Sequence, residues 1–224
     1  MAYVYHPPIV TVDAVIFRLI NDKLHVLLVE RANEPFMGAW ALPGGYNAAG
    51  NTTLQALDRV LQMKVGLRPA DFPLVEQIHA FDTVARDPRG HAISITFMCL
   101  GSAIEPEISE STQNPKFHPV HDLPPLAYDH AAIVEFALDY LRRRMLTTSI
   151  AYTLLPLDFT LTQLQGAYEA VLGRVLDKRN FRKKFLSFDI LAPSDKYYQD
   201  GAHRPALLYH FIEQSAQSLQ HSFE

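Results

Sequence analysis

Two apolar runs rich in β-branched residues stand near the start of the chain. TVDAVIFRL begins at Thr11 and LHVLLVER begins at Leu24, with the polar break NDK between them. Apolar runs separated by a short polar break are typical of a β-hairpin. Two later runs, PLVEQIHAFD and HAISITFMCLG, have the same character and predict further strands.

The segment from Thr52 to Lys64 has the spacing of an amphipathic helix. Its apolar positions are Leu54, Leu57, Leu61 and Val65. Gly66 follows directly, and glycine commonly ends a helix because it adopts a left-handed conformation without strain. The first part of the chain therefore predicts a helix embedded between strands.

Residues 102–130 are rich in Pro, Ser and acidic residues, which predicts a surface connection. The chain then returns to helical spacing at Val134, Ala137, Leu138, Leu141 and Met145. This second predicted helix ends in three arginines, residues 142–144. Cations in a last turn suit the helix dipole, so the arginines have a structural explanation.

The pattern changes near residue 150, where we place a domain boundary between residues 1–150 and 151–224. Thr160 and Gln163 fit a capping box, which predicts a helix that continues to Gly173. Asp177 is the expected N-cap of a following helix, DKRNFRKKFLSF, with Phe181, Phe185 and Phe188 along one side. The runs DILA and ALLYHF flank the polar, turn-rich PSDKYYQDGAHRP. Two helices followed by a hairpin predict a winged helix-turn-helix.

Composition and charge fit an ordinary globular protein of 224 residues, 48% apolar, with a net charge of −4. Residues 1–150 hold 12 Lys/Arg against 16 Asp/Glu, and residues 151–224 hold 8 against 8. The lone Cys99 lies in an apolar run, which fits packing in a reducing cytosol. We expect a cytoplasmic protein without a signal peptide or membrane span, because no long apolar run is present.

The stretch GGYNAAGNTTLQALDRVLQMKVGL resembles the Nudix box, Gly-x5-Glu-x7-Arg-Glu-U-x-Glu-Glu-x-Gly-U, where U is aliphatic. Gly45 opens the box, Arg59 falls at its arginine, and Leu61, Gly66 and Leu67 fill its later positions. The preceding text LLVERANEPFMGAWALPGGY also resembles the segment that leads into Nudix boxes. A Nudix α/β/α sandwich is therefore expected for the first domain, so the whole chain is expected to be a mixed α+β protein.

The glutamates of the box are missing. Asn51, Val60, Met63 and Lys64 occupy their positions, and only Asp58 remains acidic in the helix. Mg²⁺ requires oxygen ligands, which these side chains do not supply as a set. We predict no catalytic residues, no metal site and no hydrolysis. The alternative is a metal-dependent hydrolase of ADP-ribose or a related nucleoside diphosphate, with ligands from Glu76, Asp82, Asp87 or Glu105 elsewhere in the chain.

An effector site can remain without the acids. Gly44 and Gly45 permit close backbone approach, and Arg31 can pair with a phosphate. Phe36 or Trp40 can stack on a base, although each is equally well explained as core. The ten histidines show no convincing metal-binding spacing, and we interpret them as structural or solvated.

Residues 178–184, KRNFRKK, place five cations in seven positions of the second predicted helix of the winged domain. A solvated face is the simpler explanation of such a run. In a helix-turn-helix, however, Arg and Lys can read guanine, Asn can read adenine, and other cations can contact phosphates. The predicted DNA contacts are Lys178, Arg179, Asn180, Arg182, Lys183 and Lys184 on the helix, and His203 and Arg204 at the wing.

A decayed Nudix box followed by TLTQLQGAYEAVLG, LDKRNFRKK and RPALLYHF resembles the NrtR-like group of Nudix-related transcriptional regulators, as does LAYDHAAI at residues 126–133. The resemblance implies a homodimeric bacterial repressor that binds double-stranded DNA at a palindrome. It also implies a small-molecule effector, ADP-ribose or a sugar derivative, and no required cofactor. A weaker alternative is that the C-terminal module docks another protein.

Overall fold

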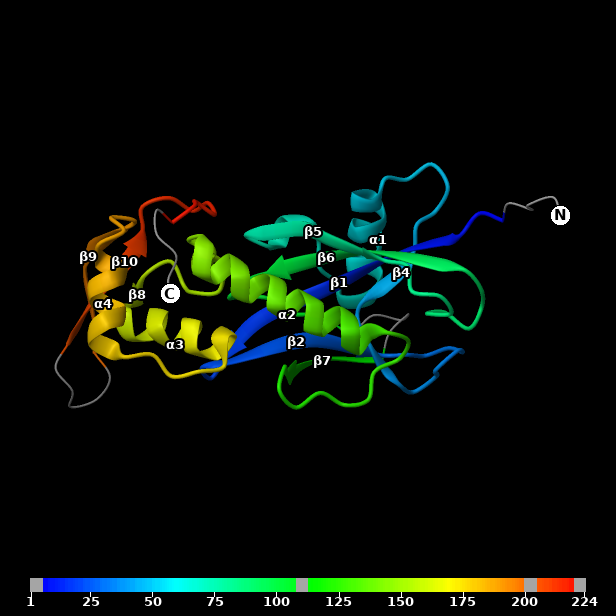
Figure 1. Cartoon of the computed structure of the whole chain (residues 1–224), viewed down its shortest axis with the longest axis horizontal. Helices are drawn as coiled ribbons and strands as arrows, with labels where there is room; N and C mark the ends of the chain where they lie inside the picture. Colours follow the sequence, from blue (N-terminus) through cyan, green and yellow to red (C-terminus); the bar gives the residue numbers. More distant parts are fainter. Residues whose placement is uncertain (1–5, 108–112, 200–204, 220–224) are drawn as a thin grey trace.

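The computed structural model describes residues 6–107, 113–199 and 205–219, and it confirms a mixed α/β fold (Figure 1). Its main sheet has seven strands in the order β3-β2-β1-β6-β5, with β4 also paired to β1 and β7 to β2. The strands are β1 (Ile9–Ile20), β2 (Lys23–Glu30), β3 (Trp40–Ala41), β4 (Gly44–Tyr46), β5 (Leu74–Phe81), β6 (Ala92–Leu100) and β7 (Gln113–Pro119). The predicted β1–β2 hairpin is confirmed, and β1 runs parallel to β6.

Helices cover both faces of this sheet. Strand β1 is buried over seven consecutive residues, 11–17, because alternate side chains pack on opposite sides. Val12 and Ile16 lie in a cluster with α1 (Thr53–Val65), whereas Val15 and Phe17 lie in a cluster with α2 (His130–Thr147). The predicted α/β/α sandwich is therefore confirmed.

Helix α1 forms where the sequence predicts it, with a capping box between Thr52 and Gln55. Gly66 ends it at φ 69°, in the left-handed region that glycine tolerates best. One predicted core position is wrong, because Leu54 is exposed and α1 buries Ala56 and Val60 instead. The buried stripe of α1 consists of Ala56, Leu57, Val60, Leu61 and Val65. A short 3₁₀ turn, η1 (Pro69–Asp71), follows α1.

The expectation of a pure surface connection over residues 102–130 is wrong. Strand β7 lies within it and pairs with β2, with His25 opposite Pro119 and Leu28 opposite Lys116. In the described part of the sheet β7 pairs with β2 alone, and proline is tolerated on such an edge strand. The sequence of β7 is polar and contains proline, so it lacks the apolar pattern by which the other strands were predicted.

The C-terminal part has the predicted winged helix. Its elements are η2 (Ile150–Thr153), β8 (Phe159–Thr160), α3 (Leu161–Leu172), α4 (Lys178–Leu186), β9 (Leu191–Tyr198) and β10 (Ala206–Phe211), with sheet order β8-β10-β9. The capping box at Thr160 and the N-cap at Asp177 are confirmed. Two details are wrong: β9 continues through PSDKYY, and α4 ends before Phe188. Among the described residues no helix could cross a membrane.

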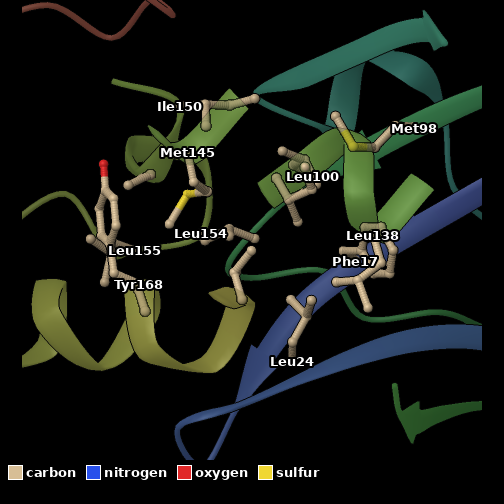
Figure 2. Close-up of a cluster of buried hydrophobic side chains, with 14 of the residues drawn as sticks. Phe17, Leu24, Met98, Leu100, Leu138, Met145, Ile150, Leu154, Leu155 and Tyr168 are labelled. Carbon is tan, nitrogen blue, oxygen red and sulfur yellow. The ribbon is translucent and has the colours of Figure 1, made fainter. Parts of the chain in front are cut away.

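One hydrophobic cluster joins the sheet to the winged helix (Figure 2). Phe17 from β1, Met145 from α2 and Leu154 from the connection are buried with Tyr168 of α3. Tyr168 in turn contacts the ring of Phe185 on α4, with ring centroids 5.3 Å apart. Cys99 is also buried, as predicted, and burial raises the pKa of its thiol.

This packing predicts that Phe185→Ala destabilises the protein by about 3–5 kcal/mol, because it leaves a cavity among aromatic rings. Leu186→Ala is the matched control, since Leu186 neighbours Phe185 on α4 but is 44% exposed. Denaturant unfolding followed by circular dichroism measures both. Equal effects of the two substitutions would contradict the packing described for α4.

Candidate functional site

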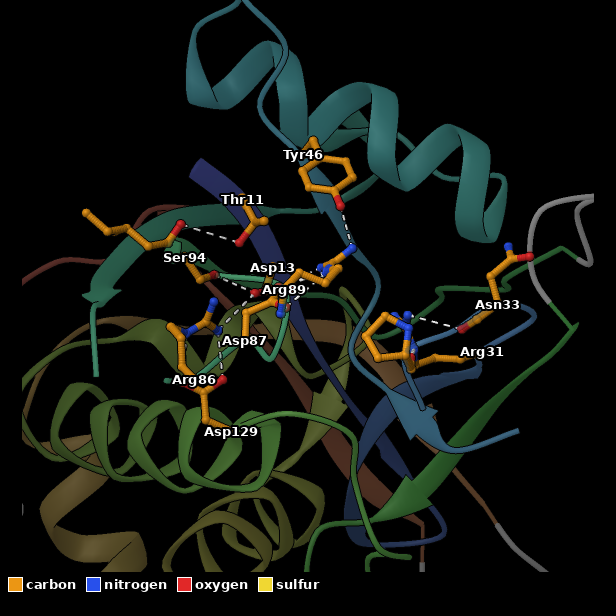
Figure 3. Close-up of polar contacts among 12 residues, drawn as sticks. Thr11, Asp13, Arg31, Asn33, Tyr46, Arg86, Asp87, Arg89, Ser94 and Asp129 are labelled. Atoms are coloured by element: carbon orange, nitrogen blue, oxygen red, sulfur yellow. Dashed lines mark hydrogen bonds and ion pairs between the residues drawn. The ribbon is translucent and has the colours of Figure 1, made fainter. Parts of the chain in front are cut away.

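A cavity of about 480 Å³ opens between β1, β4, α1, the β5–β6 loop and the start of α2. Figure 3 shows polar side chains of β1, β4, the β5–β6 loop and the start of α2 that lie around it. Its cationic lining residues are Arg31, Arg59, Lys64, Arg86 and Arg89, and its acidic ones are Asp13, Glu34 and Asp87. The lining therefore has an excess of positive charge.

A buried ion-pair network forms the floor of the cavity. Arg86 binds Asp129 through two hydrogen bonds of 2.9 and 2.7 Å, and its Nη2 lies 3.8 Å from Oδ2 of Asp13. Asp13 also accepts a hydrogen bond from the Ser94 hydroxyl. Bidentate arginine–carboxylate pairs fix orientation as well as charge. The network thus fixes the start of α2 against β1 and β6.

His130, the first residue of α2, is buried beside this network. Its Nδ1 accepts a hydrogen bond of 2.9 Å from the Leu42 amide, so the proton of the neutral ring lies on Nε2. Nε2 faces Oδ1 of Asp13 at 3.7 Å. Burial lowers the pKa of His130, although Asp13 opposes the effect. His130 is therefore a neutral group that orients the cavity floor.

Gly44, which precedes the box, and Gly45, which opens it, both line the cavity, and the fold itself explains why residue 44 is a glycine. A Cβ at residue 44 would lie 1.9 Å from Oδ1 of Asp13. Glycine is needed at position 44 because the Asp13 carboxylate occupies that space. At Gly45 a Cβ would lie 3.0 Å from Cγ2 of Val60, so the close packing of α1 limits this position too.

Arg31 and Arg89 line the cavity, each within cation–π distance of the Tyr128 ring. The guanidinium carbons of Arg31 and Arg89 lie 4.9 and 5.7 Å from the ring centroid of Tyr128. Asp87 and Arg89 form an ion pair, with Oδ2 and Nη2 2.6 Å apart. This pairing lowers the pKa of Asp87 and raises the pKa of Arg89. The Tyr128 hydroxyl is buried and has no hydrogen-bond partner among the described residues. The two arginines give this part of the cavity positive charge.

Of the predicted effector residues, Arg31, Gly44 and Gly45 lie in the lining. Phe36 is 42% exposed and packs edge-on against Tyr128, with ring centroids 4.8 Å apart, outside the lining itself. Trp40 also lies outside the lining. It packs against the hydrophobic core and the His118 ring, which is the structural alternative that its sequence context left open.

The positions of the missing glutamates do not form a divalent metal site. Val60 is buried and apolar, Asn51 and Met63 are exposed, and Lys64 lines the cavity. The pKa of Lys64 is lowered by burial and by the charge of Arg31. No group of three or more His, Cys, Asp or Glu side chains suited to a metal ion occurs in residues 6–107, 113–199 and 205–219.

The acids considered for an alternative metal site are not gathered at the cavity. Glu76 is 3.2 Å from Arg144, and Glu105 is 2.8 Å from Arg18, so each is held in an ion pair outside the lining. Asp82 is exposed and also outside it. Only Asp87 lines the cavity, where Arg89 holds it.

Sequence reasoning gave no cavity role to Asp13, Arg86, Arg89, Tyr128 or His130, which line it. The sequence does contain a signal for Asp13. This acid interrupts the apolar strand TVDAVIFRL, and a buried acid requires partners. Arg86 and His130 are far from Asp13 in the sequence. Only the folded sheet brings them together.

The basic helix α4 presents most of its predicted DNA contacts to solvent. Lys178, Arg179, Asn180 and Lys183 are exposed. Arg182 and Lys184 are partly buried, and Arg182 donates a hydrogen bond of 3.2 Å to the Thr162 hydroxyl at the start of α3. The predicted wing residues, His203 and Arg204, lie outside the described residues.

Comparisons with known proteins identify both parts of the chain. Residues 10–137 match the model of the NUDIX domain, and residues 151–211 match that of the NrtR DNA-binding winged helix domain. The ADPR responsive transcriptional repressor NtrR of Acinetobacter baylyi is 33% identical over 215 residues, which cover 94% of this chain and 84% of that protein.

Two further relatives are similar to the chain, one in the structure of nearly its whole length and one in the sequence of 138 residues. The crystal structure of Shewanella oneidensis NrtR complexed with a 27mer DNA has a TM-score of 0.81 at 29% identity, over 96% of this chain and 99% of that one. An ADP-ribose pyrophosphatase of Methanocaldococcus jannaschii is 36% identical over 138 residues, which cover 62% of this chain and 76% of that protein. From the match to the repressor over nearly the full length and from both domain models, the chain belongs to the NrtR family, in which a Nudix domain is followed by a winged helix domain.

Proposed function

We propose that this protein is a transcriptional repressor that binds DNA through its winged helix and releases it when ADP-ribose, or a related nucleotide sugar, enters the Nudix cavity. The proposal rests on one arrangement: an exposed basic helix and a cation-lined cavity joined by α2 and one hydrophobic cluster. The DNA complex and the ADPR response of the relatives support the two ligands. We assign residues 1–150 to sensing and residues 151–224 to DNA binding.

Helix α4 has the features of a recognition helix. Asp177 caps it through a hydrogen bond of 2.8 Å from the Asn180 amide, which fixes the first turn. Phe181 and Phe185 bury the opposite face, so the exposed cations point away from the core. Recognition helices read base edges mainly with residues near their N-terminus. We therefore propose that Lys178, Arg179 and Asn180 contact bases and that Lys183 contacts a phosphate.

A homodimer would present two such helices to the half-sites of a palindrome, because the symmetry of an operator mirrors that of a dimer. His203 and Arg204 are proposed to contact DNA from the wing.

Helix α2 is the proposed route between effector and DNA. Its N-terminus carries Asp129 and His130 at the cavity floor. Towards its other end, Nε of Arg142 donates a hydrogen bond of 3.0 Å to the Val171 carbonyl in α3. A ligand that moves the start of α2 would therefore displace α3, on which α4 packs.

The DNA-binding face is tested with duplexes from the promoter of the chain's own operon. Lys183→Ala should weaken binding and reduce the slope of log K against log salt by about 0.9, because one phosphate contact is lost. Asn180→Ala should instead relax sequence preference. Lys116→Ala is the control, since Lys116 is an exposed lysine on β7. Fluorescence anisotropy measures the binding. If the unmodified protein binds without sequence preference, or if its affinity hardly changes with salt concentration, this function is excluded.

The second candidate function is hydrolysis of ADP-ribose, which the pyrophosphatase relative favours. We expect ADP-ribose to bind but to remain intact with Mg²⁺ or Mn²⁺, because the residues at the box positions do not form a metal site. Loss of a general base alone typically slows a reaction by about 10²- to 10⁴-fold. Chromatography for AMP, with an active ADP-ribose pyrophosphatase alongside, measures this. Turnover at a comparable rate would establish the enzyme instead.

The role of α2 is tested with Arg142→Gln. ADP-ribose should weaken DNA binding of the unmodified protein by about 5- to 150-fold, the usual range of coupling between two sites. The variant should lose much of this factor while its affinity for ADP-ribose changes less than about twofold, since Arg142 is outside the cavity lining. Arg143→Gln, at an exposed neighbour, is the control. Unchanged coupling in Arg142→Gln would show that the signal takes another path.

A further inference from the structure

We infer that the cavity holds the diphosphate of its ligand without a divalent metal ion, with Lys64, Arg31 and Arg59 supplying the positive charge. This inference deepens the proposed function and rests on it for the identity of the complete ligand. It concerns the chemistry by which this chain, with its altered box, recognises an anion.

A metal ion does not fit the place that the box reserves for it. A divalent cation of the Mg²⁺ type needs several oxygen ligands, mostly carboxylates. The four box positions supply one exposed amide, one buried aliphatic group, one thioether and one ammonium. Lys64 lines the same cavity, and its positively charged ammonium group would repel a divalent cation there. The box therefore selects against a bound metal.

The cavity lining has five cationic side chains against three acidic ones, Asp13, Glu34 and Asp87, so its positive charge exceeds what its own acids can neutralise. Asp13 lies beside Arg86, and Asp87 holds Arg89. The guanidinium of Arg31 instead donates to backbone carbonyls, at 2.8 Å from Pro35 and 3.3 Å from Asn33.

Arg59 likewise donates to the Tyr46 carbonyl. Because carbonyl groups carry no net charge, these hydrogen bonds do not neutralise Arg31 or Arg59, and both can still attract a negatively charged ligand. Phosphate oxygens accept charge-assisted hydrogen bonds from arginine and lysine, which are stronger than neutral ones.

The three cations come from adjoining parts of the cavity wall. Arg59 and Lys64 project from α1, and Arg31 follows the end of β2. The charge of Arg31 acts directly on Lys64, because it contributes to the lowering of the Lys64 pKa. Like charges that line one cavity repel one another. A diphosphate, with one negative charge on each phosphate, relieves that repulsion when it binds between them.

The test compares binding in EDTA with binding in Mg²⁺, by isothermal titration calorimetry on the full chain. The affinity for ADP-ribose should agree within about twofold in the two buffers, because no metal takes part. Inorganic pyrophosphate in EDTA should also bind and raise the unfolding temperature. Lys64→Met should weaken both ligands by about tenfold or more, a loss in the range for hydrogen bonds to charged groups. Lys116→Met, with the same change on exposed β7, should not.

The outcomes separate this inference from the proposed function. Binding of ADP-ribose only in Mg²⁺ would overturn the metal-free site while leaving the repressor intact. Binding of pyrophosphate but not ADP-ribose in EDTA would support the site and reject that effector. Binding of neither in EDTA would overturn the inference. If Lys64→Met does not fold, the comparison of buffers with the unmodified protein decides alone.

Discussion

The hydrophobic cluster shared by the sheet, α2 and the winged helix is the interaction on which the rest of the structure depends. Apolar burial stabilises by roughly 25 cal/mol per Å² and has no directional requirement. A cluster that includes Phe17, Met145 and Tyr168 therefore holds strands and helices from both parts of the chain together. Because protein interiors are closely packed, displacement of one of these elements is felt by its neighbours. The two modules are coupled through packing as well as through the chain connection.

Helix α2 combines this packing with polar contacts at its two ends. At the cavity end, the Asp129–Arg86 pair and the His130–Leu42 hydrogen bond fix its position. Towards the winged helix, Arg142 contacts the backbone of α3. A helix is stiff along its axis, so contacts made at one end constrain the other. This gives a physical basis for communication between an effector and DNA.

The cavity shows how one scaffold can serve opposite charge preferences. The Nudix fold places one face of α1 beside Gly45, the first part of β1 and the end of β2. Glutamates on that face would attract a cation. In this chain, Lys64 and Arg59 of α1, together with Arg31, are the side chains proposed to favour an anion instead. The fold therefore supplies position, and the side chains of α1 decide the chemistry.

The sequence alone determined the features that depend on neighbouring residues. The capping boxes at Thr52 and Thr160 and the glycine at position 66 act within a few residues, so their helices were predicted correctly. The apolar runs likewise predicted the β1–β2 hairpin, and the basic run predicted α4.

Only the tertiary structure decided the features that depend on distant partners. Residues 113–119 form strand β7 because they pair with β2. The proline-containing sequence of these residues gives no local indication of that pairing. The cavity floor exists because folding brings Asp13, Arg86 and His130 to one place, where burial forces each charge or polar group to find a partner. Local signals specify helices and turns by short-range hydrogen bonds. The site is specified by long-range packing, which no single stretch of the chain contains.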